Sequence, residues 1–344
     1  MKKGRRLLLL IFVAVIIILC TLLFLRNKED KTIKKEKMPK AEVKEEKKLN
    51  IIDLESESRP YAVMINNIKT VWGYQVGLED SYLVYEMLVE GGYTRLMALF
   101  KDKNLSKIGS VRSSRHYFLD YAKENDAIYV HFGWSPQAEA DMKKLAVDNI
   151  NFLTYNGYTR DRSLGLSSEH TAYTTTEDIL KGVDEYNYSK TTKVTPVLNY
   201  SVYEIDLTLK EGVINADNVV INFSNSHITS FSYDSQNKVY KRYQNNIPHT
   251  DYVSKNIYTA KNIIVYQLDY SLISGDNKGR QTLSNITSGE GYYISNGYAV
   301  PITYEKNSRT EKTIYRYQNN EELKVNDGNT YIEISPKNRQ LTIN

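Results

Sequence analysis

The chain has 344 residues, a formal net charge of +4 at pH 7 and a single cysteine, Cys20. One cysteine excludes an intramolecular disulfide, and it excludes a cysteine-based metal site or nucleophile in the long region that follows. Residues 1–6 and 26–48 each carry a net charge of +4, so residues 49–344 carry −4. A mildly acidic main region excludes a general nucleic-acid-binding role, and we expect no nucleic-acid partner.

The apolar run from Leu7 to Leu25 predicts a transmembrane helix. The run contains no charge, and a helix of this length is roughly 28 Å long, which matches the hydrocarbon core of a bilayer. Basic residues precede it within 1–6, and positive flanks stay in the cytoplasm. We therefore expect a cytoplasmic tail over 1–6, a single-pass helix over 7–25 that makes the cell membrane a partner, and an extracytoplasmic bulk.

Two alternatives stay open for this segment. A cleaved signal peptide has a shorter apolar core and a small-residue cleavage site, and neither is present. A lipoprotein signal places a small residue just before the modified cysteine, whereas Leu19 precedes Cys20 and the apolar run continues to Leu25. An uncleaved signal-anchor fits the sequence better than either alternative.

Residues 26–58 are charged, nearly lack aromatics and show no apolar periodicity, which predicts a solvated tether. The basic first half of this stretch also suits contact with anionic lipid, although a plain spacer is the interpretation that we favour. Folded structure is expected to begin near Arg59.

Short apolar runs predict strands at 61–65, 82–89, 95–100 and 127–131. The second and third are joined by Gly91-Gly92, which indicates a hairpin. Helices are predicted over 117–124 and from Ser135 to about Leu145, where serine is a good cap and the following proline suits a first helical turn.

From about residue 215 onward the sequence consists mainly of short alternating runs of Tyr, Thr, Val and Ile. Strands are predicted at 218–223, 228–233, 238–243, 262–266, 291–295 and 330–334. The chain is therefore expected to be α+β, with one domain over 59–205 and a second, mostly β domain over 215–337. The 29 tyrosines could form a sugar-stacking surface, but tyrosine is also a good strand former, and we favour that structural explanation.

The densest group of functional side chains lies between residues 86 and 136, where arginines and a histidine stand beside glycine turns. Arginine contacts phosphate or carboxylate in a bidentate manner, and a serine-capped helix start adds backbone donors. The candidate ligand-binding residues, including one from a second cluster, are Glu90, Arg95, Arg112, Ser113, Ser114, Arg115, His131, Ser135 and His170. The alternative is a structural network in which Glu90 or Asp120 pairs with the arginines. A concave pocket with convergent side chains favours a site, whereas burial in mutual pairs favours scaffolding.

No catalytic residue can be assigned from the pattern. His170 could join His131 as a general base or metal ligand, but HExxH and other tight ligand spacings are absent, so we expect no metal. The serines lack a G-x-S-x-G setting, and there is no P-loop or G-x-G-x-x-G, so we expect no cofactor. Glycosidase carboxylates cannot be picked out among so many Asp and Glu. His249 and Asp251 are expected to fix a loop.

Several longer stretches resemble the YerB-like family. In the first half these are RPYAVMINN, YQVGLEDSYLVYEMLVEGGYTRLMALF, IGSVRSSRHYF, AIYVHFGWSPQA and the EHTAY stretch; in the second half they are FSYDSQNKVYKRY, PHTDYVSKNIYTAKNIIVY and DGNTYIEISP. The resemblance covers about Arg59 to Pro336. It implies two domains of unknown function, the first a layered α/β sandwich, in an exported and anchored protein, and it supplies no catalytic residue. Members similar to this chain usually carry a lipobox, which Leu19-Cys20 breaks, and Asn66 stands where aspartate is usual.

Two functions are consistent with these features. In the first, the protein is a membrane-anchored envelope protein that binds a cell-wall polymer or an envelope protein through an Arg/His cleft. In the second, it is an enzyme acting on phosphate-bearing envelope substrates, with Arg95, Arg112 and Arg115 neutralising phosphates and His131 or Glu90 moving a proton. The strand followed by VRSSR is faintly similar to the pyrophosphate sites of LytR-type wall-polymer transferases, an analogy only.

Overall fold

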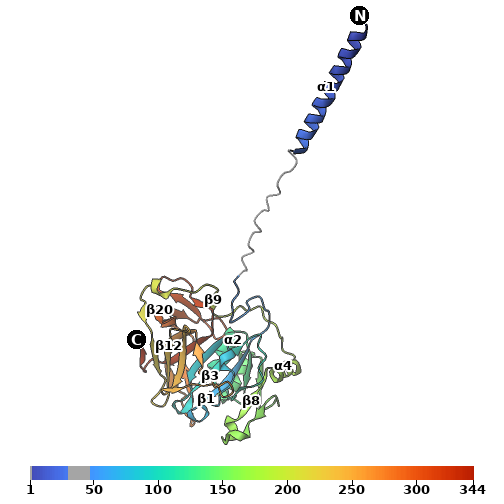
Figure 1. Ribbon diagram of the computed structural model, residues 1–344. Coiled ribbons are helices and arrows are strands. Elements are labelled where there is room, and N and C mark those ends of the chain that lie inside the picture. The colour runs from blue at the N-terminus through green and yellow to red at the C-terminus, as the bar shows by residue number, and fades with distance from the viewer. Residues whose placement is uncertain (1, 30–46) are drawn as a thin grey trace. The chain divides into compact units, whose positions relative to one another are not determined.

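The computed structural model describes residues 2–29 and 47–344, which form two units (Figure 1). The first unit is the helix α1 (Lys2–Glu29), whose segment Leu8–Arg26 is long and apolar enough to cross a membrane. The hydroxyl of Thr21 donates to the backbone oxygen of Ile17 at 2.9 Å, so this polar group is satisfied within the helix. The part of the predicted tether over 30–46 lies outside the described residues.

The second unit begins at residue 47, earlier than the start near Arg59 that the composition predicts. The backbone N–H of Asn50 donates to the carboxylate of Asp327 at 2.9 Å, and Ile52 is only 6% exposed. The prediction of a solvated tether is therefore wrong for residues 47–58, which belong to the second unit: Leu49, Ile51 and Ile52 pack into its apolar cluster, while Leu54 stays 51% exposed.

An eleven-stranded mixed sheet forms the centre of the second unit. Its order is β10-β20-β19-β16-β23-β2-β3-β1-β5-β6, and β21 pairs with β20. The first half of the chain supplies β1 (Tyr61–Asn67), β2 (Leu83–Leu88), β3 (Thr94–Phe100), β5 (Ile128–His131) and β6 (Asn149–Asn151). The second half supplies β10 (Ile214–Asn215), β16 (Asn262–Leu268), β19 (Ser288–Ser295), β20 (Tyr298–Glu305), β21 (Ile314–Tyr317) and β23 (Thr330–Pro336). The halves meet where β2 and β23 pair in parallel, with Leu83 opposite Thr330, so the two predicted regions share one sheet.

A second, six-stranded sheet packs on one face of the central sheet. Its order is β14-β13-β12-β11-β24, and β15 pairs with β13. The strands are β11 (Asn218–Asn222), β12 (Ile228–Asp234), β13 (Val239–Gln244), β14 (Ile247–Pro248), β15 (Thr259–Ala260) and β24 (Leu341–Ile343). Val219 and Phe231 of this sheet lie in one buried apolar cluster with Val84 and Tyr331 of the central sheet. This burial of apolar surface is what holds the two sheets face to face.

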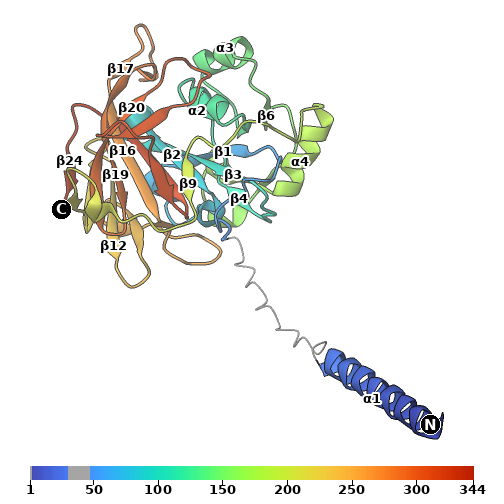
Figure 2. The ribbon, with the colours of Figure 1, turned by 90° about the horizontal axis from the view of Figure 1, so that it is seen from above.

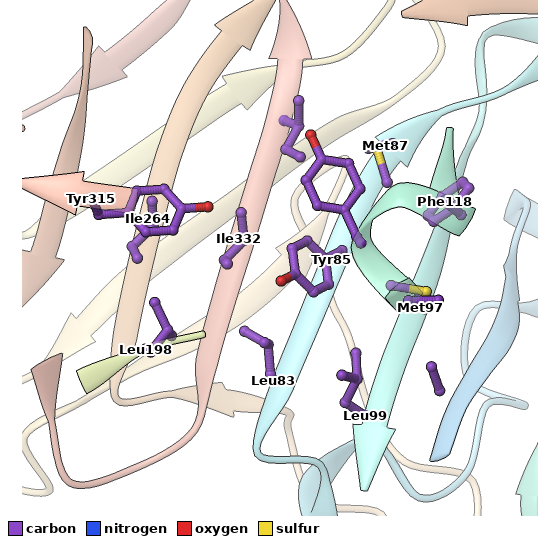
Figure 3. Close-up of a cluster of buried hydrophobic side chains, with 14 of the residues drawn as sticks. Leu83, Tyr85, Met87, Met97, Leu99, Phe118, Leu198, Ile264, Tyr315 and Ile332 are labelled. Atoms are coloured by element: carbon purple, nitrogen blue, oxygen red, sulfur yellow. The ribbon is translucent and has the colours of Figure 1, made fainter. Parts of the chain in front are cut away.

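The opposite face of the central sheet is covered by two of the three helices of the second unit. Phe118 of α2 (Phe118–Glu124) and Met142 of α3 (Pro136–Lys144) join the cluster on that face, together with side chains from both halves of the chain (Figure 3). The third helix, α4 (Thr176–Glu185), packs against β6 on the side of the second sheet. Figure 2 shows that all three helices gather around the strands of the N-terminal half.

The remaining strands form three small sheets. One contains β4 (Ile108–Gly109), β8 (Ala172–Thr174) and β7 (Thr159–Arg160) in that order. A second pairs β17 (Tyr270–Leu272) with β18 (Gln281–Leu283), and a third pairs β9 (Asn199–Ser201) with β22 (Lys324–Asn326). The first of these sheets fixes the start of the segment that carries Arg112 to Arg115, because β4 leads directly into it.

The predicted fold class is confirmed, with a mixed α/β N-terminal region followed by a strand-rich C-terminal region. The hairpin is present, since β2 and β3 are antiparallel neighbours and Gly91 and Gly92 between them have positive φ values of 70° and 75°. Both predicted helices are present, and the Ser135 hydroxyl caps α3 by accepting from the Ala138 N–H at 3.2 Å.

Candidate functional site

The segment that carries Arg112 to Arg115 is held by backbone hydrogen bonds to the middle of β1 and to the turn that follows β5. The N–H of Arg112 donates to the oxygen of Met64 at 2.8 Å, and that of Ser114 donates to the oxygen of Gly133 at 2.9 Å. These bonds place the segment beside the first residues of β3. Five of the predicted site residues meet there: Glu90, Arg95, Ser113, Ser114 and Arg115.

Arg95 is the most deeply placed cation of this group, with 7% of its surface exposed. Its Nη1 donates to the backbone oxygen of Ser113 at 2.6 Å. Among the described residues, no carboxylate forms an ion pair with it and no other acceptor binds its guanidinium. Burial, with the positive charge of Arg115 added, lowers the pKa of Arg95 to about 9. The fold therefore holds a mostly buried guanidinium that has no ion-pair partner among the described residues, and the nearby Glu90 carboxylate, which pairs with Arg115, offsets only part of the effect of burial on its pKa.

Arg115, in contrast, is fully paired. Its Nε and Nη2 donate to the two carboxylate oxygens of Glu90 at 2.5 and 2.7 Å, and its Nη1 donates to the backbone oxygen of Ser114 at 2.7 Å. Burial alone would raise the pKa of Glu90, but the hydrogen bonds and charge of Arg115 lower it. Glu90 is thus held as a carboxylate that occupies Arg115 in a bidentate manner.

Arg112 points to a second, more exposed carboxylate. Its Nη2 lies 3.5 Å from Glu169 Oε2, whose side chain is 58% exposed. The same carboxylate contacts His170 Nε2 at 3.2 Å, and His170 Nδ1 lies 3.0 Å from the Nδ2 of buried Asn66. Burial and the nearby Arg112 lower the pKa of His170, so its ring is mainly neutral at pH 7. Glu169 was not among the predicted site residues, yet it links two of them.

His131 and Ser135 do not reach the arginines. His131 is fully buried, with Nδ1 2.9 Å from the oxygen of Gly133 and Nε2 3.1 Å from Asn149 Oδ1. Burial lowers the pKa of His131 to about 4, which leaves the ring neutral. The Ser135 hydroxyl is used as the cap of α3. The arginines that the sequence grouped with His131 therefore lie apart from it, and the contacts of His131 are those of a residue that holds neighbouring chain segments in place.

The three guanidinium groups differ in what they can still bind. Arg115 is occupied by Glu90, Arg112 is held by an exposed and weakly bound Glu169, and Arg95 has only a backbone acceptor. Exposed ion pairs contribute little and are easily exchanged. The arginine cluster, defined as Arg95, Arg112 and Arg115, thus retains the capacity to bind one anionic group. Within the described residues, no three His, Cys, Asp or Glu side chains lie close enough together to hold a metal ion.

Sequence reasoning missed a larger polar group between the two sheets. Glu86 on β2 is fully buried and accepts from Arg242 Nη2 on β13 at 2.5 Å, while His227 Nε2 lies 3.0 Å from its other oxygen. The pKa of Glu86 is lowered because the charge of Arg242 and the bond to His227 outweigh the effect of burial. Arg242 also contacts His249, which was expected only to fix a loop.

A second glutamate belongs to the same group. Glu333 stands opposite Glu86 in the parallel β2–β23 pair, and the two side chains share a hydrogen bond in which the protonated carboxyl of Glu333 donates to Glu86. Burial and the charge of Glu86 raise the pKa of Glu333 well above its usual range, so Glu333 is the protonated member of the pair. The available sequence signal was a charged residue at an inward position of an otherwise apolar strand, as in YLVYEMLV and TYIEISP.

Comparisons with known proteins cover most of the chain. Residues 49–189 match the model described as "Protein of unknown function (DUF3048) N-terminal domain", and residues 219–332 match the corresponding C-terminal domain. A relative from Bacillus subtilis (strain 168), named "Putative lipoprotein YerB", is 27% identical over 309 residues, or 89% of this chain and 88% of the relative.

A solved structure agrees with this relationship. The crystal structure of the YerB protein from Bacillus subtilis matches with a TM-score of 0.72 and 26% identity, over 86% of this chain and 99% of that one. The architecture described above is therefore shared with that protein. The chain belongs to the YerB-like family, whose members combine the N-terminal and C-terminal DUF3048 domains of unknown function.

Proposed function

We propose that this protein is anchored in the cell membrane by α1, as a single-pass helix with the second unit outside the cell, and that the arginine cluster binds an anionic group of an envelope component. A wall polymer or an envelope protein would supply that group. The anchor is supported by the length and composition of Leu8–Arg26 and by the basic residues before it. The name of the Bacillus relative, which describes a lipoprotein, agrees with attachment to a membrane.

The observation that carries the binding proposal is the setting of Arg95. A buried charge without an ion-pair partner is unfavourable, and the Glu90 carboxylate, which is bound to Arg115, compensates Arg95 only in part. Arg95 lies beside two further arginines and is bound only to the Ser113 carbonyl. An incoming phosphate or carboxylate would offset this repulsion and would take the guanidinium nitrogens that have no acceptor.

The neighbouring groups define how such an anion would bind. Arg115 contributes charge while Glu90 occupies its nitrogens, whereas Arg112 can exchange the exposed Glu169 for the ligand. Ser113 is half-buried and directly follows Arg112 in the chain. Its backbone oxygen accepts from Arg95 Nη1 and so orients the Arg95 guanidinium. Planar, bidentate binding of phosphate or carboxylate is what arginine provides best.

The enzymatic alternative has less support. Proton transfer was assigned to His131 or Glu90, but His131 is enclosed among Gly133 and Asn149, and Glu90 is held by Arg115. We therefore propose binding and not turnover as the function of the arginine cluster.

The test uses the full chain in lipid nanodiscs, titrated with inorganic pyrophosphate and with a glycerol-phosphate polymer. Arg95→Gln should weaken binding of both probes by about tenfold or more, the expected loss for one charge-assisted contact. The matched control is Arg339→Gln, which removes a surface arginine bound to Asn225 and should leave binding unchanged. Unaltered binding by Arg95→Gln and Arg112→Gln would show that the cluster is only scaffolding.

A further inference from the structure

A cavity of about 400 Å³ lies along β6, the outermost strand at one end of the central sheet. It is separate from the arginine cluster, and none of the predicted site residues lines it. The walls come from α3, from β6 with the residues on either side of it, and from the segment after α4. The side chains that matter for its chemistry are Trp134, Glu139, Asp148, Asn151, Tyr186 and Tyr188. Its volume is within the range of small-molecule sites.

Aromatic rings form much of the wall. Trp134, Tyr186 and Tyr188 are all half-buried, so each presents part of a ring to the cavity. The rings of Tyr186 and Tyr188 lie 5.7 Å apart, and the Tyr188 hydroxyl donates to the backbone oxygen of Asn149 at 3.2 Å. That hydrogen bond fixes the ring of Tyr188. Rigid rings with one apolar face and one polar edge suit a ligand that is itself apolar on one face and polar at its rim.

One polar group in the wall is buried without a partner. Asn151 is 3% exposed, and its Oδ1 accepts from the N–H groups of Gly133 and Leu153 at 2.9 and 3.1 Å. These two bonds set the orientation of the amide, and its Nδ2 is then left with no acceptor among the described residues. A buried donor without an acceptor is unfavourable, so a ligand or water in the cavity would complete it.

The charges of the wall argue against an anionic ligand. Two carboxylates, Glu139 and Asp148, line the cavity with one exposed ammonium group, that of Lys143 at 3.7 Å from Glu139, and Arg59 binds Asp148 at 2.6 Å without lining the cavity, so carboxylates outnumber cations in the wall. Carboxylates accept hydrogen bonds from hydroxyl groups, and the Asn151 amide can donate to one. The wall therefore offers acceptors, one fixed donor and aromatic faces to a neutral molecule rich in hydroxyl groups.

We infer that this cavity binds a neutral sugar ring of an envelope glycan, with Tyr186 and Trp134 stacking on the ring and Asn151 donating to one of its oxygens. This site does not depend on the arginine cluster, although the two share a border at Gly133, whose N–H bonds Asn151 and whose oxygen bonds Ser114.

The experiment is saturation-transfer NMR and calorimetry on the full chain in nanodiscs, with N,N′-diacetylchitobiose and maltose as probes. Saturation transfer to at least one of the two sugars is expected. Asn151→Asp keeps the acceptor for Gly133 and Leu153 and removes the donor, and it should weaken sugar binding by about tenfold. Tyr186→Ala should do the same. The matched control is Tyr203→Ala, a tyrosine that is 69% exposed and outside the cavity.

Circular dichroism and melting temperature establish that each variant is folded. If Asn151→Asp and Tyr186→Ala both fail to fold, Glu139→Gln at a half-buried helical position serves instead, and it should also weaken binding because the carboxylate acceptor is removed. Sugar binding that is lost in the cavity variants but kept in Arg95→Gln supports the inference separately from the proposed anion site. Absence of saturation transfer to both sugars, or unchanged binding in the folded cavity variants, overturns it.

Discussion

Glu86 and Glu333 face each other across adjacent parallel strands, fully buried, and Arg242 is the cation that accompanies them. One positive charge neutralises one carboxylate, so the second glutamate keeps its proton. The lowered pKa of Glu86 and the raised pKa of Glu333 express this division. His227 and His249, which also face the group, lie on the side of the second sheet, so the arrangement links both sheets.

The first prediction concerns pH. Glu333 binds its proton more tightly in the folded than in the unfolded state, because its pKa is raised above the ordinary glutamate pKa of 4.5. The stability that this proton contributes is complete below pH 4.5 and is lost as the pH rises towards the pKa of Glu333 in the folded state. The slope for one proton is about 1.4 kcal/mol per pH unit. Glu333→Gln removes this dependence on pH. In urea unfolding of the full chain in detergent, the free energy of unfolding of this variant should decline less steeply above pH 4.5 than that of the wild type. Glu305→Gln, at an exposed strand position, should follow the wild type.

The second prediction concerns the counter-charge of Arg242. In Glu86→Gln, Glu333 can ionise and replace the missing carboxylate, which limits the loss of stability. The double variant Glu86→Gln/Glu333→Gln leaves a buried arginine without a counter-charge and should lose about 3–5 kcal/mol. Denaturant midpoints measure this difference. Equal stability of the single and double variants would mean that Glu333 does not compensate.

The third prediction concerns the competition between Glu90 and a ligand. Glu90→Gln removes the carboxylate that occupies Arg115, so pyrophosphate should bind about tenfold more tightly, by one additional charge-assisted contact. Glu177→Gln, whose side chain is 74% exposed on α4, is the control. Weaker pyrophosphate binding by a folded Glu90→Gln variant would indicate that Glu90 serves to position Arg115 for the ligand.

The fourth prediction concerns topology. Exposed Ser235 can be replaced by cysteine in a Cys20→Ala background, and a membrane-impermeant maleimide should label it in intact cells. Gly4→Cys in the same background should react only after lysis, because residues 1–6 are expected in the cytoplasm. Labelling of both positions only after lysis would place the second unit inside the cell.

The sequence predicted local structure better than it predicted contacts between distant residues. Alternating Tyr, Val and Ile identified β11, β12 and β16, and Ser135-Pro136 identified the start of α3, because these signals depend on neighbouring residues. The pairing of β2 with β23 depends on register between segments about 250 residues apart along the chain, and no local pattern reports it.

The candidate site shows the same limit. The sequence grouped Arg95 with Arg115, and in the fold the two guanidinium groups are close enough for the charge of Arg115 to lower the pKa of Arg95. It could not reveal that Glu90 occupies Arg115 while Arg95 has no carboxylate, because that choice is set by side-chain geometry. Nor could it separate His131 from the arginines, since the neighbour of His131 is Asn149 on the adjacent strand.

Anion binding by the arginine cluster can be observed directly in a crystal structure of the full chain grown with phosphate or tungstate. We expect an anion within hydrogen-bonding distance of the Arg95 guanidinium, with Arg112 turned from Glu169 towards it. A structure in which Arg95 still contacts only the Ser113 carbonyl, at saturating anion and with the same pairs Arg115–Glu90 and Arg112–Glu169, would contradict it.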